Sequence, residues 1–569
     1  MPKGISRRSF FGRVAAASVA GAAANPIPSR SAPLQTSSEH ASPPVDILRI
    51  PDRVTAFAGL DHPVTLSRSA KSWQASGIDV EFAPDANQMS VAIASPSLAL
   101  THVHLRWSSD VESRLRCLGD AWERSYGDLA WRGIIPERVM PWYFVTWDGA
   151  ACHGYGVKTG ASVLCFWQLD QEGVSLWLNL SNGGDGVQLG NRRLEAATIV
   201  TRGGQTGEFE ISAIREFCRA MCEKPRLPGS PVYGSNDWYY AYGKNSATQT
   251  LRDADLVADC SVGLPVRPFT VIDDGWRDAS RFPDMHVLAG EIKKHNVRPG
   301  VWIRPLIAPA SMPKNLLLPD SRFGTQKQRA RELAFDPTVP DALELILAKV
   351  TEVLDFGFEL VKHDYTTYDL LGRWGFEMGA SPTTPGWSLH DRSRTNAEVI
   401  RDLYQAIRKT AGERTLILGC NTVGHLGAGL FEAQRTGDDT SGEQWERTRK
   451  MGVNTLAFRL PQHGTFFALD PDCVGITSAI PWEYNRQWLD VVARSGATLF
   501  ISPDPRAMGP DQKKAIAEAF RIAAAGGSGM CATDWLDTSS PEHWGRPGSP
   551  GEDLRYRWCS VEGADPFAS

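Results

Sequence analysis

The chain has 569 residues, 42% of them hydrophobic and 22% charged, which is the balance of a globular protein with two or three domains. Its formal net charge of −5 gives no electrostatic reason to expect a nucleic-acid partner. Ten cysteines in so long a chain exclude a disulfide-dense scaffold, and their spacing matches no zinc site. Cys218 and Cys222 would share one face of a helix, as a disulfide or as two buried thiols. Of the 19 tryptophans we expect most to fill cores and a few to offer flat faces to a ligand.

The first residues resemble an export signal. Arg7 and Arg8 stand just before two phenylalanines, and an alanine-rich apolar stretch follows. This pattern is typical of a twin-arginine signal peptide over residues 1–24, with a basic tail as the alternative. No segment is apolar for long enough to span a membrane, so we expect a periplasmic or secreted protein without a membrane anchor. Residues 25–45, rich in Pro, Ser and Ala, predict a disordered linker.

Residues 46–228 predict a β-sandwich. Short alternating runs, such as 162–169 and 174–180, are broken by Gly, Asp and Asn, as in the turn cluster 181–186. A helical stretch near 213–222 precedes several prolines, which mark a domain boundary.

From residue 229 onward, short apolar strands alternate with amphipathic helices. Strand patterns lie at 269–272, 298–303, 358–361, 415–418 and 498–501, and helical patterns at 340–356, 396–410 and 510–524. Repeated units of this length predict a (β/α)₈ TIM barrel over 229–530, an α/β fold. A doubly wound sheet is the rival, but no glycine-rich turn follows the first strand, which argues against dinucleotide binding. Residues 531–569 would form a short C-terminal segment.

Polar residues follow four strands of the predicted barrel. They are Asp273-Asp274-Gly275-Trp276, Lys362-His363-Asp364, Gly419-Cys420-Asn421 and Arg435-Thr436-Gly437-Asp438-Asp439. A single loop carboxylate is usually only solvated, but the carboxyl ends of barrel strands converge on one active face. Four polar strand ends in one barrel therefore predict a catalytic site.

The carboxylates in this set suit glycoside cleavage, which needs one ionised carboxylate to attack and one protonated carboxyl to release the leaving oxygen. Lys362 lies two residues before Asp364 on the same side of a strand, so its positive charge favours the ionised form of Asp364. Asp438 and Asp439 are a like-charged pair, which tends to raise one carboxyl pKa, as a general acid requires.

The strand-end motifs resemble those of the melibiase-type α-galactosidases, a family group that also includes raffinose synthases. The resemblance rests on residues 271–276, 362–364 and 435–440, and residues 236–239 and 300–305 also fit. It covers the barrel and extends loosely to the predicted sandwich. The assignment rests on the joint order of these motifs along the chain.

The resemblance implies a retaining double-displacement mechanism, with Asp364 as the nucleophile and Asp438 as the general acid/base. It implies a sugar pocket whose polar contacts come from Asp273, Asp274, Lys362, Cys420 and Arg435, with walls from Trp238, Trp276 and Trp302. The choice of Asp438 follows the family pattern in which the acid comes directly after a small residue, here Gly437. In a related branch the acid lies four residues after the arginine, which would select Asp439.

Two positions depart from the family pattern. His363 stands where the family has an aromatic residue, and we expect it to be a packed histidine behind the nucleophile. The loop that begins at Cys420 continues with Thr422, Val423 and His425 where relatives carry small residues, so the substituent at C2 of the sugar is left open.

The leading hypothesis is an exported hydrolase of terminal α-galactosides or closely related sugars. The alternatives are an α-galactosyl transferase, an α-N-acetylgalactosaminidase, and a carbohydrate-binding protein on an inactive barrel. The expected partner is an oligosaccharide or glycoside. Neither a metal nor a nucleotide cofactor is implied, because two carboxyl groups suffice for this chemistry.

Overall fold

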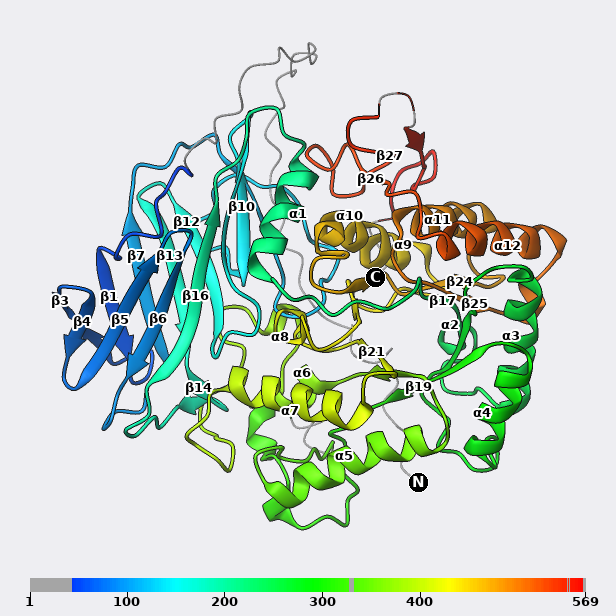
Figure 1. The fold of residues 1–569 in the computed structure, drawn as a ribbon, viewed down its shortest axis with the longest axis horizontal. Helices are drawn as coiled ribbons and strands as arrows, with labels where there is room; N and C mark the ends of the chain where they lie inside the picture. Colours follow the sequence, from blue (N-terminus) through cyan, green and yellow to red (C-terminus); the bar gives the residue numbers. More distant parts are fainter. Residues whose placement is uncertain (1–42, 327–331, 550, 552, 566–569) are drawn as a thin grey trace.

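The computed structural model describes residues 43–326, 332–549, 551 and 553–565. The predicted signal peptide and nearly all of the predicted linker lie outside these residues. A β-rich N-terminal part is followed by alternating strands and helices, and a small β-structure near the C-terminus lies above them in Figure 1.

The N-terminal part contains two antiparallel sheets, here called the two-sheet domain. One has six strands in the order β2-β1-β7-β13-β12-β9, and the other has eight in the order β3-β4-β5-β6-β16-β11-β10-β8. The strands are β1 (Arg53–Phe57), β2 (Pro63–Thr65), β3 (Ser67–Ser69), β4 (Ser72–Ala75), β5 (Ile78–Asp85), β6 (Gln88–Ala94), β7 (His102–Ser108), β8 (Arg116–Gly119), β9 (Met140–Pro141), β10 (Tyr143–Trp147), β11 (Cys152–Val157), β12 (Leu164–Asp170), β13 (Gly173–Asn179) and β16 (Leu194–Arg202).

Alternating apolar residues build these strands. In β5, Ile78, Val80 and Phe82 are buried while the acidic residues between them are more exposed, which is the period of a strand with one face on a core. The two sheets touch through large aromatic side chains: the rings of Phe144 in β10 and Trp167 in β12 have centroids 5.8 Å apart. The indoles of Trp73, Trp107, Trp122, Trp131, Trp142 and Trp167 are buried, so most indoles of this domain are core residues, as expected.

A ring of parallel strands forms the second part. The strand order is β23-β22-β21-β20-β19-β18-β17-β25-β24, and each pair of neighbouring strands is parallel. The strands are β17 (Tyr233–Asn236), β18 (Phe269–Ile272), β19 (Arg298–Ile303), β20 (Leu360–His363), β21 (Leu416–Gly419), β22 (Ala433–Arg435), β23 (Ala468–Asp470), β24 (Cys473–Ile476) and β25 (Leu499–Pro503). Since β23 pairs with β22, and β24, which follows after two residues, pairs with β25, a broken seventh strand closes a barrel of eight positions.

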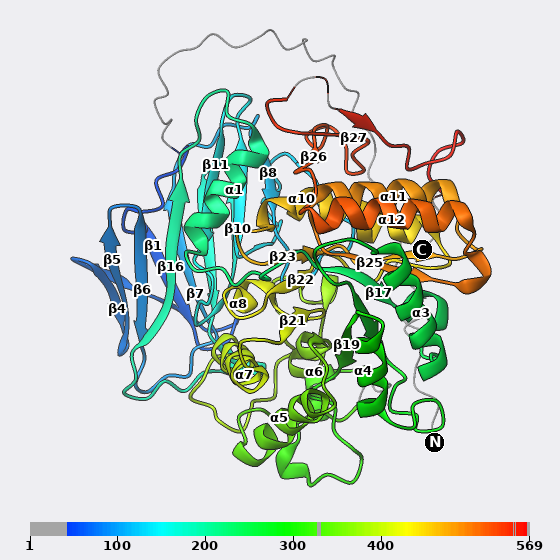
Figure 2. The same cartoon turned by 45° about the vertical axis from the view of Figure 1, so that its right-hand side comes forward.

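Helices cover the outside of the barrel (Figure 2). They are α3 (Ala247–Cys260), α4 (Met285–Lys294), α5 (Pro340–Asp355), α7 (Asn396–Ala411), α11 (Trp482–Ser495) and α12 (Pro510–Ala524), with shorter helices α2 (Trp238–Ala241), α6 (Thr366–Leu371), α8 (Gly424–Gly427), α9 (Trp445–Thr448) and α10 (Thr455–Arg459) at the strand ends. Local signals set their starts: α7 begins at a capping box between Thr395 and Glu398, and α5 and α12 begin with proline. The predicted helices at 340–356, 396–410 and 510–524 agree with these bounds to within one residue.

The structure also shows the state of the cysteines and the character of the helices. Helix α1 (Glu210–Met221) packs between the two-sheet domain and the barrel, and carries Cys218 as a buried free thiol just before Cys222. All ten cysteines lie within the described residues and none is disulfide-bonded. Among the described residues, no helix is long and apolar enough to cross a membrane.

Candidate active site

The polar strand ends do meet at one end of the barrel. Asp364 follows β20 and is almost fully buried. Its Oδ2 accepts a hydrogen bond of 2.9 Å from Nε1 of Trp302, and its Oδ1 accepts from the backbone N–H groups of Tyr365 at 2.7 Å and Asn421 at 3.1 Å. Tyr365 adopts a positive φ of 66°, which is unusual for a residue with a side chain and marks a strained turn directly after Asp364. Three donors on one carboxylate stabilise its ionised form and fix its orientation.

Lys362 and Asp273 form a buried ion pair from neighbouring parts of the sheet. The Lys362 Nζ lies 2.6 Å from Oδ2 of Asp273, which also accepts from Nδ2 of Asn236 at 2.9 Å. Asp237 lies behind this pair and accepts from the backbone N–H of Asp273 at 2.9 Å. Burial, together with the negative charge of Asp273, raises the pKa of Asp237 to about 7. Lys362 thus pairs with Asp273 in this structure, and Asp274 is exposed beyond it.

Arg435, at the end of β22, is buried and lies close to several carboxylates. Its Nη2 lies 2.8 Å from Asp472 and 3.4 Å from Asp439, and its Nη1 donates to Sγ of Cys420 at 3.3 Å. Asp472 sits at the break of the seventh strand with a φ of 74°, so the break aims its carboxylate at Arg435. Asp472 and Asp470, which lies 3.9 Å from Arg435, therefore anchor this guanidinium.

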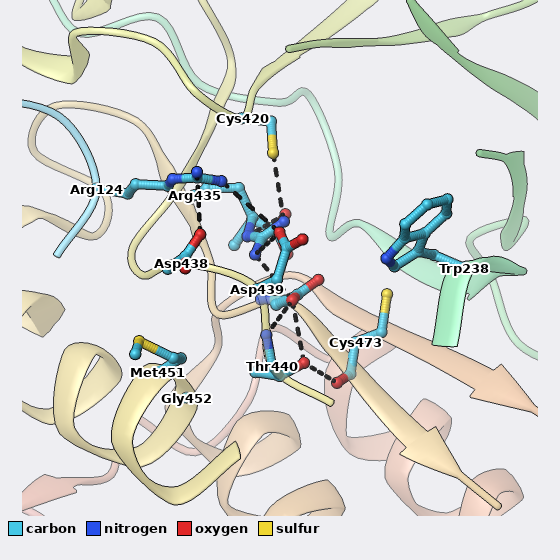
Figure 3. Close-up of polar contacts among 12 residues, drawn as sticks. Arg124, Trp238, Cys420, Arg435, Asp438, Asp439, Thr440, Met451, Gly452 and Cys473 are labelled. Atoms are coloured by element: carbon cyan, nitrogen blue, oxygen red, sulfur yellow. Dashed lines mark hydrogen bonds and ion pairs between the residues drawn. The ribbon is translucent and has the colours of Figure 1, made fainter. Parts of the chain in front are cut away.

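The adjacent carboxylates Asp438 and Asp439 differ in their surroundings (Figure 3). Each oxygen of Asp438 has its own guanidinium: Arg124 lies 2.9 Å from Oδ1 and Arg447 lies 2.7 Å from Oδ2. The Asp439 carboxylate lies 3.4 Å from Arg435 and 3.7 Å from Arg124. In Figure 3 the Asp438 carboxylate lies below Arg124, and Asp439 lies on the side of Asp438 that faces Trp238.

Gly437 precedes this pair for a steric reason. A Cβ placed there would come within 2.1 Å of the backbone oxygen of Met451 and 2.6 Å of the Thr455 hydroxyl. The acid loop therefore passes directly over the π-helical segment Arg449–Asn454, and any larger residue would push Asp438 and Asp439 out of place.

The three predicted tryptophans have different roles. Trp302 bonds Asp364 directly, and its backbone oxygen accepts from Nε1 of Trp276 at 2.8 Å. Both indoles are buried, so Trp276 supports Trp302. Trp238 is half-buried and packs edge-on against Tyr242, with ring centroids 5.8 Å apart.

The loop after Cys420 turns into the protein. The Thr422 hydroxyl donates to the side chain of Gln434 at 2.8 Å, and Val423 is buried. Nε2 of His425 lies 2.8 Å from the backbone oxygen of Val157, and its ring stacks on Trp142 of the two-sheet domain with centroids 4.7 Å apart. The bulkier residues are thus used for packing.

His363 points away from the nucleophile, as a packed histidine would. It is fully buried, contacts the Thr366 hydroxyl, and packs near the rings of Tyr404 and Phe431. Burial lowers its pKa to about 3, so the imidazole is neutral at physiological pH.

Two residues that no sequence motif indicated, Glu123 and Arg124, reach the site from the loop between β8 and β9 of the two-sheet domain. Both are buried, and they contact Asn421 and Asp438 respectively. Arg447 on α9 is a third such residue, and it contacts Asp438. A charged residue in a loop carries no local signal of such a contact. Within the described part of the chain, no group of three or more His, Cys, Asp or Glu side chains could hold a metal ion.

Comparison with known proteins bears on the fold. No family model matches this chain. The structure is similar to that of an α-galactosidase from Thermus thermophilus in complex with p-nitrophenyl α-D-galactopyranoside, with 17% identity, a TM-score of 0.54, and coverage of 88% of this chain and 99% of that one. The GH36 α-galactosidase AgaB of Geobacillus stearothermophilus matches with 12% identity, a TM-score of 0.54, and coverage of 86% and 72%. The galactosidase domain of the α-galactosidase–sucrose kinase AgaSK matches with 13% identity, a TM-score of 0.52, and coverage of 81% and 68%.

At these identities the likeness shows a shared fold, which is the fold of GH36 α-galactosidases with their TIM-barrel catalytic domain. The resemblance to melibiase-type α-galactosidases that the strand-end motifs indicated is therefore confirmed at the level of the fold.

Proposed function

We propose that this protein is a retaining α-glycosidase that acts on terminal α-galactosides or closely related sugars, with Asp364 as its nucleophile. The observation that carries the proposal is the environment of Asp364: a buried carboxylate at a barrel strand end, held by an indole N–H and two backbone N–H groups. A nucleophile must be ionised and aimed, and these donors favour both.

The sugar-binding part of the proposal rests on the carboxylates and cations around Asp364. Lys362, Asp273 and Arg435 present donors and acceptors at neighbouring strand ends, the arrangement needed to bind several hydroxyls of one ring. The solved structures of similar fold include α-galactosidases in complex with stachyose and raffinose, which supports a sugar substrate here.

For the general acid/base we propose Asp439, which the spacing of the related branch selects, while the small-residue pattern selects Asp438. A general acid must hold a proton at the start of the reaction. Asp438 has a guanidinium against each oxygen, from Arg124 and Arg447, and Asp439 lies 3.4 Å from Arg435 and 3.7 Å from Arg124. Asp439 is the fourth residue after Arg435, which is the spacing of the acid in the related branch, and this spacing carries the choice.

The test uses nitrophenyl α-glycosides. We expect Asp364→Ala to abolish turnover of p-nitrophenyl α-D-galactopyranoside, and a 2-fluoro-galactosyl fluoride to label Asp364 in a peptide identified by mass spectrometry. Asp439→Asn should retain activity on substrates with good leaving groups and be accelerated by azide, since azide needs no general base. Asp438→Asn is the matched control, and azide acceleration in that variant alone would return the role to Asp438.

A substrate screen separates mechanism from specificity. Activity on another α-glycoside but on no α-galactoside would change the proposed substrate and leave Asp364 as the proposed nucleophile. Turnover that survives in Asp364→Ala would remove Asp364 as the nucleophile.

A further inference from the structure

The loop between β8 and β9 of the two-sheet domain is clamped onto the barrel beside the acid pair. The backbone N–H of Ser125 donates to the backbone carbonyl oxygen of Thr436 at 2.8 Å. The backbone N–H of Asp438 donates to the backbone carbonyl oxygen of Ser125 at 2.8 Å. Ser125 and Gly437 thus form a parallel bridge between the two parts. Gly127, with a φ of 75°, lets the loop pass within contact of the backbone of Lys450.

Arg124 is directed at the carboxylates by this clamp. Its side chain is 4% exposed, and its guanidinium lies 2.9 Å from Asp438 and 3.7 Å from Asp439. The guanidinium also lies 5.3 Å from the ring centroid of Trp374. One residue of the two-sheet domain therefore touches both members of the acid pair.

Glu123 reaches the other side of the site. Its side chain is 1% exposed, accepts from the Tyr126 hydroxyl at 2.5 Å, and accepts from the amide Nδ2 of Asn421. The backbone N–H of Asn421 is one of the three donors to Asp364. Burial raises the pKa of Glu123, and the adjacent Arg124 opposes that shift.

Packing of the two-sheet domain against the barrel does not require the charges of Glu123 and Arg124. A buried ion pair contributes little net stability compared with well-packed apolar residues, because both charges lose their hydration. The interface nevertheless buries a glutamate and an arginine whose partners are the residues that flank the proposed reaction centre.

We propose that Glu123 and Arg124 are positioning residues of the active site, so that the two-sheet domain completes the catalytic machinery of the barrel. Arg124 fixes the Asp438–Asp439 pair and sets the pH range in which the general acid keeps its proton, and Glu123 orients Asn421 against Asp364. This inference rests on the proposed glycosidase function.

The charged groups around the acid pair determine the direction of the expected pH effect. Asp438 is faced by Arg124 and Arg447, and Asp439 by Arg124, Arg435 and the adjacent carboxylate. Further titratable groups whose charges act on Arg124, Arg435 or Asp439 include Glu123, Tyr126, Tyr239, Asp472 and Cys420. Removing the Arg124 charge takes a cation away from either candidate acid, so a proton binds more readily whichever aspartate is the acid.

The experiment measures kcat/KM against pH for the full chain on p-nitrophenyl α-D-galactopyranoside. Arg124→Met should move the alkaline limb of the profile to higher pH by about one pH unit. A neighbouring arginine lowers the pKa of a carboxyl group by about 1–3, and the expected change is at the low end because two other arginines remain. Arg124→Lys keeps the charge and should leave the limb in place, while kcat falls about tenfold because an ammonium cannot bridge both carboxylates. Glu123→Gln turns a second donor toward Asn421 and should lower kcat about tenfold.

Arg106→Met is the matched control, because it removes a buried arginine from the two-sheet domain whose bidentate partner is Asp170. This variant should keep the wild-type pH profile. An alkaline limb that does not move in Arg124→Met overturns the inference, whatever the change in kcat. If that variant does not fold, wild-type kcat in Arg124→Lys overturns it instead. Wild-type protein without activity on any α-glycoside would refute the proposed function, which is a different outcome.

Discussion

The Lys362–Asp273 pair offers a test of the site that needs no substrate. The two side chains are 7% and 0% exposed and lie 2.6 Å apart. Lys362→Met keeps the length of the side chain and removes its charge, which leaves the Asp273 carboxylate with the Asn236 amide and the backbone N–H of Asp274. Asp237 beside it adds a second acidic group without a cation.

The distance between the two charges sets the expected loss of stability in Lys362→Met. Two unit charges about 3 Å apart attract by roughly 5 kcal/mol at an effective dielectric constant of about 20. Because removing one partner leaves the other buried and uncompensated, we expect Lys362→Met to lower the free energy of unfolding by about 3–5 kcal/mol. The double variant Lys362→Met/Asp273→Asn should lose less than Lys362→Met alone, because no uncompensated carboxylate remains at position 273.

The assay is chemical denaturation followed by tryptophan fluorescence, with the two single variants and the double variant in one cycle. The loss in Lys362→Met should shrink between pH 7.5 and pH 5, as protonation neutralises the unpaired carboxylate. Lys294→Met, which removes an exposed ion pair with Glu291, should change stability by less than about 0.5 kcal/mol. Strictly additive losses in the cycle would refute the reasoning, since they would mean that the two charges do not stabilise each other.

Three further predictions concern the nucleophile, the pH dependence of stability, and export. Trp302→Phe removes one charge-assisted hydrogen bond to Asp364 and should lower kcat/KM about 10- to 100-fold with little change in thermal unfolding, whereas a loss below threefold would contradict that role. Burial raises the pKa of Asp237 from 3.8 to about 7, so the folded state binds an extra proton between these values and stability falls as pH rises through this window. Asp237→Asn should flatten that fall in denaturation measured from pH 4 to 8, and an unchanged slope would exclude this group. We also propose that residues 1–24 direct twin-arginine export, so replacing Arg7 and Arg8 by lysine should retain a fused reporter in the cytoplasm, and continued export would refute it.

Several strands of the barrel could be predicted from the local pattern of apolar residues. The predicted strands 269–272 and 298–303 coincide with β18 and β19, because buried parallel strands are short apolar runs bounded by polar turns. The strand-end rule then placed Asp273, Lys362 and Asp364 at one end of the barrel without any knowledge of their contacts.

The pairing of charges could not be read in the same way. Lys362 was expected beside Asp364 by strand periodicity, and in the structure its ammonium lies against Asp273 on β18. Periodicity fixes which face of a strand a side chain occupies, but the partner across the sheet depends on how the barrel strands are staggered.

The sequence by itself determined the order of strands and helices and the strand ends that carry Asp364 and the acid pair, because these follow from short-range periodicity and turn chemistry. Only the tertiary structure decided that Glu123 meets Asn421, 298 residues away, and that Arg124 meets Asp438. Such contacts arise where two separately patterned parts of the chain dock, and the docking depends on the shapes of both surfaces. Local propensity carries no information about that fit, so the two-sheet domain's part in the site became visible only in the folded chain.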